Sequence, residues 1–556
     1  MSKSLAIALA LSVALAATAS PQSTPDLQGL WGATLRFGPD IQGPLIIYRT
    51  PDGWRADIAG FSVPARREGQ SFAFELPDGK GSFRGGHWIQ PERFATPVTL
   101  VADGKDRWRG TVSPLESRLT FFMPITRHPD GSLRTYLRNP ERNIGRFTRV
   151  SRIEVNGHDV RLIGQAGSRV DTTLAQGRYE DGVISVPLRG GTYDFTRVTD
   201  SSSSPFYPRG ARAPRYRYTP PLQLHDGWPV ASLDDVGISR DSIERFVQLL
   251  LDIPMDSLNT LQIHSLLMAR HGQLVVEEYF HGYDRDQPHD TRSASKSWTA
   301  TLIGAAMQAG VPLHTSTPVY QTMLDSVPAN LDPRKRAMTL EHLLTMTAGF
   351  NCDPDDPSSA DEDQIADQDS IVDWYRHTLN VALVAAPGEK IFYCSAEPNV
   401  AAGMLAKVAN QHLPELFERL IARPLRMRDY HLELTPSGEA YGGGGHRFRP
   451  RDFLKFAQLM VNDGRWEGKQ IVSREWARHS TAPLRSFTPT QHWGYLWNGA
   501  EYPYQSRTVR AFFAGGNGGQ VFMGIPELDL VIGFTGGNYS DRVRISVPEY
   551  LVRAVN

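Results

Sequence analysis

The chain has 556 residues, with 59 Lys and Arg against 60 Asp and Glu, and only two cysteines. This length is too great for one hydrophobic core, so we expect two or more domains. The formal net charge of −1 argues against a general nucleic-acid-binding protein.

The charge is unevenly distributed. Residues 21–220 contain 28 Lys and Arg against 20 Asp and Glu, whereas residues 221–556 contain 30 against 40. The basic half could contact an anionic surface such as a cell-wall polymer or lipid, or it could dock on the acidic half. An ordinary solvated basic surface is the simplest alternative.

Residues 1–19 have the pattern of a secretory signal peptide. Lys3 supplies the positive start, residues 5–16 are apolar, and Ala17-Thr18-Ala19 fits the small-x-small cleavage rule. No later run reaches the ~20 apolar residues of a membrane-spanning helix. We expect cleavage after Ala19 and a periplasmic or secreted protein without a transmembrane segment.

Residues 24–200 are expected to form an all-β domain. Short alternating runs such as residues 43–49 are separated by Gly, Pro and Asp turns. Gly29-Leu30-Trp31 resembles the opening of a lipocalin-like barrel, but a barrel and a sandwich fit the pattern equally well. A Ser-, Pro- and Arg-rich stretch at residues 201–221 predicts a linker. A second domain of residues 222–556 follows, and its first helix is expected at residues 239–251.

The tetrad Ser293-Ala294-Ser295-Lys296 points most directly to chemistry. A serine hydroxyl is a poor nucleophile unless a base takes its proton. Residues three apart share a helix face, so Lys296 can reach Ser293. Residues 297–307 are apolar almost all round, which predicts a buried helix. Burial lowers a lysine pKa, so a neutral Lys296 could act as the base. Taken alone, the tetrad would more often indicate a serine that caps a buried helix.

Tyr393 follows the turn signal Pro387-Gly388 and precedes a second predicted buried helix at residues 400–408. The two cysteines, Cys352 and Cys394, are expected to form a disulfide in an exported protein. Such a bond would close a loop beside Tyr393 and hold it in place. A catalytic Cys394 is the alternative, although no Cys–His–Asn pattern surrounds it.

Residues 514–520 read Ala-Gly-Gly-Asn-Gly-Gly-Gln between two apolar runs, residues 509–513 and 521–525, that are expected to be strands. Consecutive glycines in a strand usually mark close approach by a ligand or another chain. An acyl group could lie against these glycines, with a main-chain N–H facing its carbonyl oxygen.

Taken in this order, the features of residues 225–556 resemble the serine β-lactamase and penicillin-binding-protein superfamily. The nearest resemblance is to class C β-lactamases and the related esterases, D-aminopeptidases and aminohexanoate-oligomer hydrolases. Residues 266–280 look like the hairpin before the serine, residues 339–350 are similar to the family's HLLTHTSGL, and residues 443–456 to its GGL…RDLAKF. The resemblance implies an α+β fold: an antiparallel sheet flanked by helices plus a helical subdomain, preceded here by an all-β barrel or sandwich.

The resemblance also implies roles for individual residues. Ser293 would be the acylated nucleophile, Lys296 its proton acceptor or an electrostatic aid, and Tyr393 the general base and later acid. The main-chain N–H groups of Ser293 and Gln520 would form the oxyanion hole. The residues expected to contact substrate are Ser395, Asn517, Gly518 and Gly519.

Two positions depart from the family pattern. Ser395 stands where the family usually has Asn, and Asn517-Gly518-Gly519 stands where β-lactamases have Lys-Thr-Gly. Because Asn517 has no charge, a carboxylate-bearing β-lactam is not the expected substrate. We expect a serine hydrolase of carboxylic esters or small amides. The alternatives are a D-amino-acid peptidase or β-lactamase, and a non-catalytic receptor for cell-wall peptides.

No metal or cofactor is expected. The acidic stretch at residues 353–369 lacks the alternating ligands, central Gly and closing Glu of a calcium loop, and no His-Glu-x-x-His occurs. The stretch is expected to be a solvated loop or, alternatively, a gate that favours cationic substrates.

Overall fold

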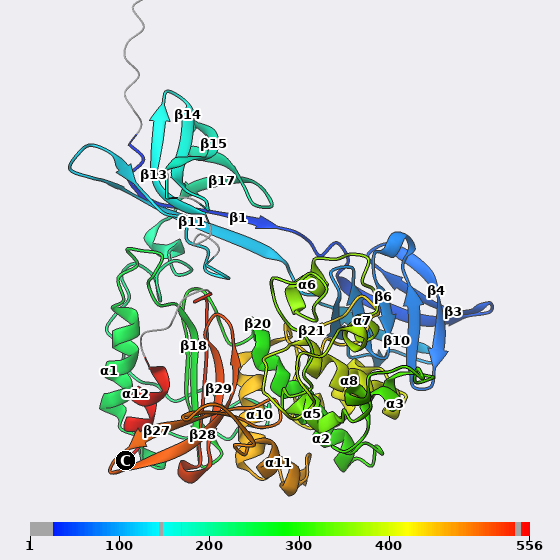
Figure 1. The fold of residues 1–556 in the computed structure, drawn as a ribbon. Helices are drawn as coiled ribbons and strands as arrows, with labels where there is room; N and C mark the ends of the chain where they lie inside the picture. Colours follow the sequence, from blue (N-terminus) through cyan, green and yellow to red (C-terminus); the bar gives the residue numbers. More distant parts are fainter. Residues whose placement is uncertain (1–25, 144–147, 168, 540–545) are drawn as a thin grey trace, which may run out of the picture. The chain divides into compact units, whose positions relative to one another are not determined.

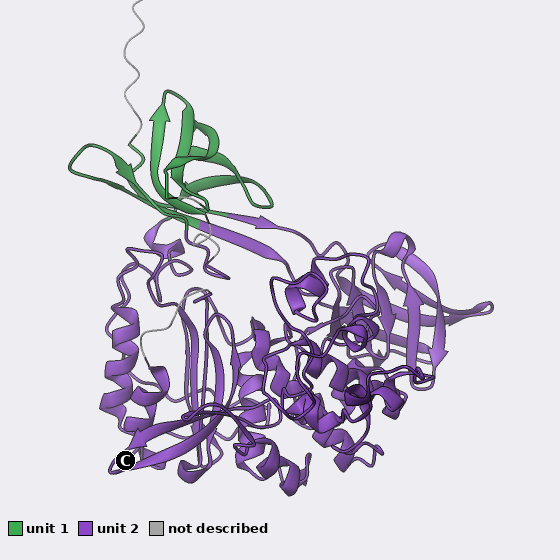
Figure 2. Cartoon of the chain, viewed as in Figure 1, with its two compact units in different colours: residues 1–33, 122–137, 147–198 green, residues 34–121, 138–146, 199–556 purple. Residues whose placement is uncertain are grey.

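The computed structural model describes residues 26–143, 148–167, 169–539 and 546–556, so the expected signal peptide lies outside the described residues. The chain divides into two compact units (Figure 2). Unit 1 comprises residues 1–33, 122–137 and 147–198, and unit 2 comprises residues 34–121, 138–146 and 199–556. No helix in the described ranges is long and apolar enough to cross a membrane.

Unit 1 is built on a closed β-barrel (Figure 1). Tyr193 and Phe195 are two residues apart on one strand, so both point to the same side, and both are fully buried with Trp31. The barrel strands are β1 (Gly29–Arg36), β11 (Arg118–Arg127), β12 (Leu133–Arg134), β13 (Arg149–Asn156), β14 (Asp159–Gln165), β15 (Thr172–Glu180), β16 (Val183–Leu188) and β17 (Gly191–Arg197). The expected all-β fold of the N-terminal region is confirmed.

A second β-structure, formed by residues 34–121, belongs to unit 2. Its edge strand β8 pairs with β21 of the C-terminal region, with Ala95 opposite Leu432. The ring of His87 also contacts the Tyr430 hydroxyl at 3.0 Å. Residues 24–200 therefore contribute to both units, because residues 37–117 lie between barrel strands β1 and β11. The ten strands, in spatial order, are β21 (Leu432–Glu433), β8 (Phe94–Pro97), β7 (His87–Gln90), β6 (Ser82–Arg84), β5 (Ser71–Glu75), β4 (Phe61–Glu68), β3 (Gly53–Ile58), β2 (Gly43–Thr50), β10 (Arg107–Val112) and β9 (Val101–Ala102).

The segment expected to be a linker packs on the rest of unit 2. Tyr216 and Tyr218 are buried, Arg209 pairs with Glu278, and Arg217 lies 3.4 Å from Glu244. Residues 209–217 hold four arginines and no acid, which is half of the basic excess in residues 21–220. Two of these four arginines, Arg209 and Arg217, therefore face acidic partners within the same chain.

The C-terminal region contains an antiparallel eight-stranded sheet with helices on both faces (Figure 1). Along β18, Leu266 and Met268 pack in the cluster with α1 and α12, whereas Leu267 and Ala269 pack in the cluster with α2 and α10. Because both faces are covered, β18 is buried along almost its whole length. The strands, in spatial order, are β19 (Gln273–Tyr279), β18 (Ile263–Arg270), β30 (Leu530–Gly536), β29 (Gln520–Ile525), β28 (Arg507–Gly516), β27 (Asn498–Tyr504), β26 (Gln491–Trp493) and β25 (Arg485–Thr488). The predicted hairpin over residues 266–280 is confirmed as β18–β19.

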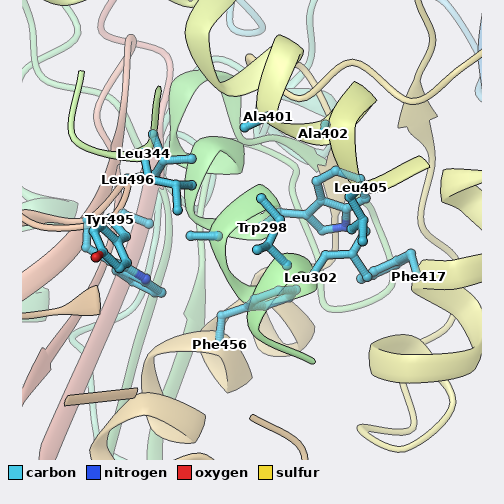
Figure 3. Close-up of a cluster of buried hydrophobic side chains, with 14 of the residues drawn as sticks. Trp298, Leu302, Leu344, Ala401, Ala402, Leu405, Phe417, Phe456, Tyr495 and Leu496 are labelled. Atoms are coloured by element: carbon cyan, nitrogen blue, oxygen red, sulfur yellow. The ribbon is translucent and has the colours of Figure 1, made fainter. Parts of the chain in front are cut away.

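The helical part is centred on α2, which is buried from Lys296 to Ala306. Trp298 is fully buried and its ring contacts that of Phe417 (Figure 3). The Trp298 ring also packs against the ring of His446. The predicted helices at residues 239–251, 297–307 and 400–408 are confirmed as α1, α2 and α8. The helices are α1 (Arg240–Leu251), α2 (Lys296–Gln308), α3 (Val319–Met323), α4 (Pro333–Arg336), α5 (Leu340–Leu344), α6 (Glu362–Ala366), α7 (Trp374–Asn380), α8 (Ala396–Ala409), α9 (Leu413–Phe417), α10 (Pro450–Val461), α11 (Arg474–Ser480) and α12 (Val547–Arg553).

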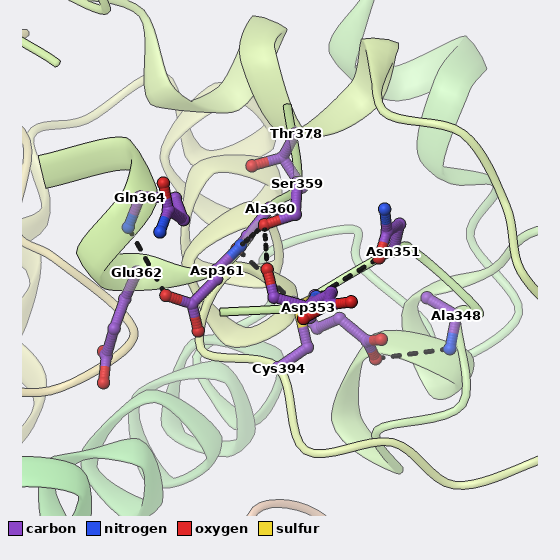
Figure 4. The surroundings of a disulfide bond; sticks show 12 residues. Ala348, Asn351, Asp353, Ser359, Ala360, Asp361, Glu362, Gln364, Thr378 and Cys394 are labelled. Carbon is purple, nitrogen blue, oxygen red and sulfur yellow. Dashed lines mark hydrogen bonds between the residues drawn. A yellow bond between two sulfur atoms is a disulfide. The ribbon is translucent and has the colours of Figure 1, made fainter. Parts of the chain in front are cut away.

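Cys352 and Cys394 form the expected disulfide, with their Cα atoms 5.7 Å apart (Figure 4). The bond joins residues 42 apart in sequence and ends one residue after Tyr393. It therefore ties the tyrosine-bearing segment to the segment that follows α5.

The double substitution of Cys352 and Cys394 by Ser is expected to lower the free energy of unfolding by about 4 kcal/mol, because the unfolded chain regains the entropy of a 42-residue loop. Urea unfolding at neutral pH measures this difference. Wild-type protein unfolded in reductant serves as the matched control and should approach the stability of the variant. Equal stability of oxidised wild type and variant would contradict the prediction.

Candidate active site

Ser293 lies in a short 3₁₀ helix, η5 (Arg292–Ser295), which leads directly into α2. Lys296 is the first residue of α2 and is 1% exposed, and its Nζ lies 3.0 Å from Ser293 Oγ. The same amine donates a hydrogen bond to the carbonyl oxygen of Gly443 at 2.5 Å. The spacing of the tetrad thus brings hydroxyl and amine into contact, although the serine precedes the α-helix instead of lying on it.

The glycine run at residues 442–445 packs against the serine-bearing turn. The carbonyl oxygen of Gly442 accepts a hydrogen bond from the Thr299 hydroxyl at 2.8 Å. A Cβ on Gly444 would lie only 3.2 Å from the carbonyl oxygen of Arg292 and 3.6 Å from Ser293 Cα. The run therefore lets backbone approach backbone at the lysine. In the sequence, Gly443 and Gly444 stand out only as part of a family pattern, and nothing local to them predicts a place in the site.

Tyr393 is 48% exposed and stands beside the lysine, whose Nζ lies 4.8 Å from the centre of the tyrosine ring. Its position is fixed on one side by the neighbouring disulfide and on the other by a hydrogen bond from the Phe392 N–H to the Met346 carbonyl oxygen at 2.9 Å. The structure therefore brings together the three residues predicted to be catalytic.

Aromatic rings extend outward from Tyr393. Trp493 packs edge-on to Tyr393 at 6.3 Å between ring centres, and Phe487 packs edge-on to Trp493 at 5.7 Å. Phe487 is itself 39% exposed on β25. This row gives the surroundings of Tyr393 an apolar wall that the sequence analysis did not identify, because β25 and Tyr393 are almost 100 residues apart.

The glycine-rich segment approaches the serine through a residue other than those predicted. Asn517, Gly518 and Gly519 lie in the turn between β28 and β29 and not within a strand. The residue in contact is Gly516, the last residue of β28: a Cβ there would lie 2.4 Å from the Thr291 carbonyl oxygen and 3.0 Å from the Ala294 nitrogen. Substrate contact by residues 517–519 stays a prediction.

Gln520 and Ser395 are both buried. The Gln520 side-chain amide donates hydrogen bonds to the carbonyl oxygens of Asn517 and Gly536. The backbone of Gln520 pairs with that of Gly516 across the β28–β29 hairpin. The carbonyl oxygen of Ser395 would lie 2.6 Å from a Cβ on Gly443. Ser395 therefore packs against Gly443, whose carbonyl oxygen accepts the hydrogen bond from the Lys296 amine. The oxyanion-hole role of Gln520 and the substrate contact of Ser395 stay predictions.

Replacing Gly516 with Ala is expected to lower the rate of hydrolysis, because the new methyl group collides with backbone atoms of the turn that positions Ser293. A displacement of about 1 Å in a reacting group can cost roughly 100-fold in rate. Steady-state kcat with a 4-nitrophenyl ester measures the effect. Thr508→Ala, an exposed residue of the same strand, is the matched control. An unaltered kcat for Gly516→Ala would show that the contact does not position the serine.

Glu433 of β21 is partly buried beside the glycine run, where a Cβ on Gly445 would overlap its carboxylate. Burial, reinforced by the neighbouring Asp290 carboxylate, raises the pKa of Glu433 to about 7 despite the opposing effect of nearby arginines. Because the folded-state pKa lies above the ordinary 4.5, the folded protein holds an extra proton between these values. The stability that this proton contributes is lost as the pH rises towards and through 7.

Glu433→Gln, which resembles the protonated acid, is therefore expected to become progressively more stable than wild type between pH 5 and pH 8, by up to about 3 kcal/mol. Urea unfolding of both proteins at several pH values measures the difference. Parallel pH profiles of the two proteins would contradict the pKa shift.

The acidic stretch contains α6, and the Glu362 carboxylate on this helix accepts a hydrogen bond from the Tyr441 hydroxyl at 3.1 Å. Within the part of the chain that the structure describes, no group of three or more His, Cys, Asp or Glu residues could hold a metal ion.

Comparison with known proteins shows the family to which this chain belongs. The Beta-lactamase family model matches residues 264–547, about half of the chain, and this range contains Ser293, Lys296, Tyr393 and the glycine-rich turn. The chain belongs to the beta-lactamase family. The expected fold, a β-lactamase-like domain preceded by β-structure, is thereby confirmed.

Individual relatives are more distant. The chain is 24% identical over 224 residues to a 6-aminohexanoate-dimer hydrolase of Paenarthrobacter ureafaciens; the match covers 38% of this chain and only 55% of that relative. Among solved structures, EstCE1, a hydrolase with promiscuous acyltransferase activity, matches 57% of this chain and 97% of its own, with 17% identity and a TM-score of 0.45. A penicillin-binding protein homologue from Caulobacter crescentus matches 53% of this chain and 92% of its own, with 17% identity and a TM-score of 0.41.

Proposed function

We propose that this β-lactamase-family protein is an exported serine hydrolase that cleaves carboxylic esters or small amides through an acyl-enzyme. The observation that carries the proposal is the 3.0 Å contact between Lys296 Nζ and Ser293 Oγ at a buried helix start. A nucleophile in hydrogen-bond contact with a basic group is the arrangement that covalent catalysis requires.

The reaction would proceed in two steps. Ser293 Oγ attacks the carbonyl carbon, and its proton passes to the Lys296–Tyr393 pair while the oxyanion is stabilised by the N–H groups of Ser293 and Gln520. Collapse of the tetrahedral intermediate releases the alcohol or amine, which takes up the proton. Water then attacks the acyl-enzyme and gives a proton to Tyr393 and Lys296, and this proton passes to Ser293 Oγ as the acid leaves.

Two observations bear on the substrate. The aromatic row Tyr393, Trp493 and Phe487 favours a substrate with an apolar group. The relative from Paenarthrobacter ureafaciens is a 6-aminohexanoate-dimer hydrolase, which is in line with a small-molecule substrate. A D-amino-acid peptidase or β-lactamase would use the same acyl-enzyme, whereas a cell-wall peptide receptor would bind without turnover.

A fluorophosphonate probe is expected to add one phosphonyl group to Ser293, detected by intact mass and peptide mapping. Ser293→Ala should abolish both labelling and hydrolysis of 4-nitrophenyl esters. Lys296→Ala and Tyr393→Phe should each lower kcat by about 100- to 10,000-fold, the usual contribution of a general acid or base.

Ser486→Ala, an exposed serine on β25, is the matched control and should label and turn over like wild type. Parallel assays with D-alanyl amides and a chromogenic cephalosporin separate the esterase from the peptidase and β-lactamase. Absence of an adduct at Ser293 would overturn the proposal, and ligand binding without product would favour the receptor.

A further inference from the structure

Three arginines converge on one carboxylate immediately before the serine. Asp290 Oδ2 lies 3.3 Å from Arg142, 3.4 Å from Arg447 and 3.7 Å from Arg292. Burial by itself would raise the pKa of Asp290, but the three guanidinium groups overcome this effect and hold its pKa below the ordinary value. Asp290 is therefore ionised at neutral pH and balances only one of the three positive charges that surround it.

The remaining positive charge is accessible. The side chains of Arg142 and Arg292 are 46% and 37% exposed, whereas that of Asp290 is buried. The other carboxylates that act on Arg292 are Glu433 and Glu362. Glu433 holds its proton over much of the range below pH 7, so two carboxylates, Asp290 and Glu362, face three guanidinium groups there and a net positive charge remains. Two partly exposed guanidinium groups are thus left facing solvent beside the nucleophile.

Buried donors at the same place lack an acceptor. Among the described residues, neither the Tyr539 hydroxyl nor Arg447 Nε has a hydrogen-bond partner, and both atoms are buried. Arg292 lies over the Tyr539 ring at 5.6 Å from its centre. Burial raises the pKa of Tyr539 well above its ordinary value, although the three arginines oppose this effect, so its hydroxyl remains a donor. Because buried polar groups in native proteins are nearly always paired, these donors point to a missing acceptor. An anion can accept hydrogen bonds from arginine N–H groups and from a tyrosine O–H group at the same time.

This cluster adjoins the glycine-rich turn. Gly516 packs against Arg292, because a Cβ on Gly516 would lie 3.2 Å from the Arg292 Cβ. A Cβ on Gly518 would lie 2.6 Å from the Tyr539 ring. Arg292 and Tyr539 therefore flank the turn at which Asn517 stands in place of the lysine of β-lactamases.

We propose that Arg292 and Arg142, together with the Tyr539 hydroxyl, form a subsite for a free carboxylate of the substrate. The inference rests on the proposed function, because it names the substrate class of the same site: esters or small amides that carry a carboxylate. It also revises the expectation drawn from the uncharged Asn517. The positive charge is supplied by Arg292, which precedes Ser293, and by Arg142.

The test compares substrate pairs that differ only in a carboxylate: 4-nitrophenyl hydrogen adipate with 4-nitrophenyl hexanoate on the acyl side, and 3-acetoxybenzoate with phenyl acetate on the leaving-group side. The measured quantity is the ratio of kcat/KM for the carboxylate-bearing member to that for the neutral member. Wild type should prefer the carboxylate in at least one pair. A lost charge-assisted hydrogen bond should reduce that ratio about 10- to 100-fold in Arg292→Ala and in Arg142→Ala.

Arg292→Lys should retain part of the preference, because the charge remains but the two-pronged geometry is lost. Arg245→Ala, an exposed arginine on α1, is the control and should leave the ratio unchanged. Raising the salt concentration should weaken the preference. A wild type that prefers the neutral member of both pairs, or arginine variants that lower both members equally, would overturn the subsite.

A second measurement separates this inference from the proposed function. Adipate binding to Ser293→Ala protein, followed by titration calorimetry, requires no turnover. Binding that is lost in the Ser293→Ala/Arg292→Ala double variant supports the subsite even if no ester is hydrolysed. Absence of adipate binding together with absence of a carboxylate preference would overturn it, while labelling at Ser293 would leave the hydrolase proposal standing.

Discussion

The hydrogen bonds of the buried Lys296 amine hold the candidate site together. Lys296 is removed from water at the start of α2, and a buried amine without partners would cost several kcal/mol. Its partners are the Ser293 hydroxyl and the Gly443 carbonyl oxygen, so the amine joins the serine-bearing turn to the glycine run at residues 442–445. A Cβ on Gly443 would lie 2.6 Å from the Ser395 carbonyl oxygen, and one on Gly444 would lie 3.2 Å from the Arg292 carbonyl oxygen, so this junction favours glycine.

The same turn is held from the side of the sheet by Gly516 at the end of β28. Backbone therefore packs closely on both sides of η5, and Arg292 adopts a left-handed conformation, φ 48°, immediately before Ser293. A non-glycine residue in that region is strained, and such strain persists only where the surrounding packing imposes it. The serine hydroxyl is thus positioned by rigid backbone contacts, which is the condition for a pre-organised nucleophile.

Local patterns were sufficient for part of this arrangement. The spacing of Ser293 and Lys296 and the apolar run behind them predicted α2, because both signals lie within a few helical turns. The contact through Gly516 could not be predicted from the same kind of signal, since it depends on the register in which Gly516 pairs with Gln520. The division of the N-terminal region between the two units could not be predicted from local patterns either. Residues 34–121 show the same alternation as the barrel strands, and only the pairing of Ala95 with Leu432, far away in sequence, assigns them to unit 2.

The charge of the candidate site illustrates the limit of comparing motifs position by position. An ionic contact in water is effective over only about 10 Å, so a cation that replaces the missing lysine must lie close to the glycine-rich turn. Nothing requires that it come from the same strand. Arg292 reaches the turn because it precedes Ser293, and Arg142 reaches Asp290 because the loop at residues 138–143 folds beside it. The local field created by all neighbouring residues, and not the identity of residue 517 alone, decides which substrates the site can hold.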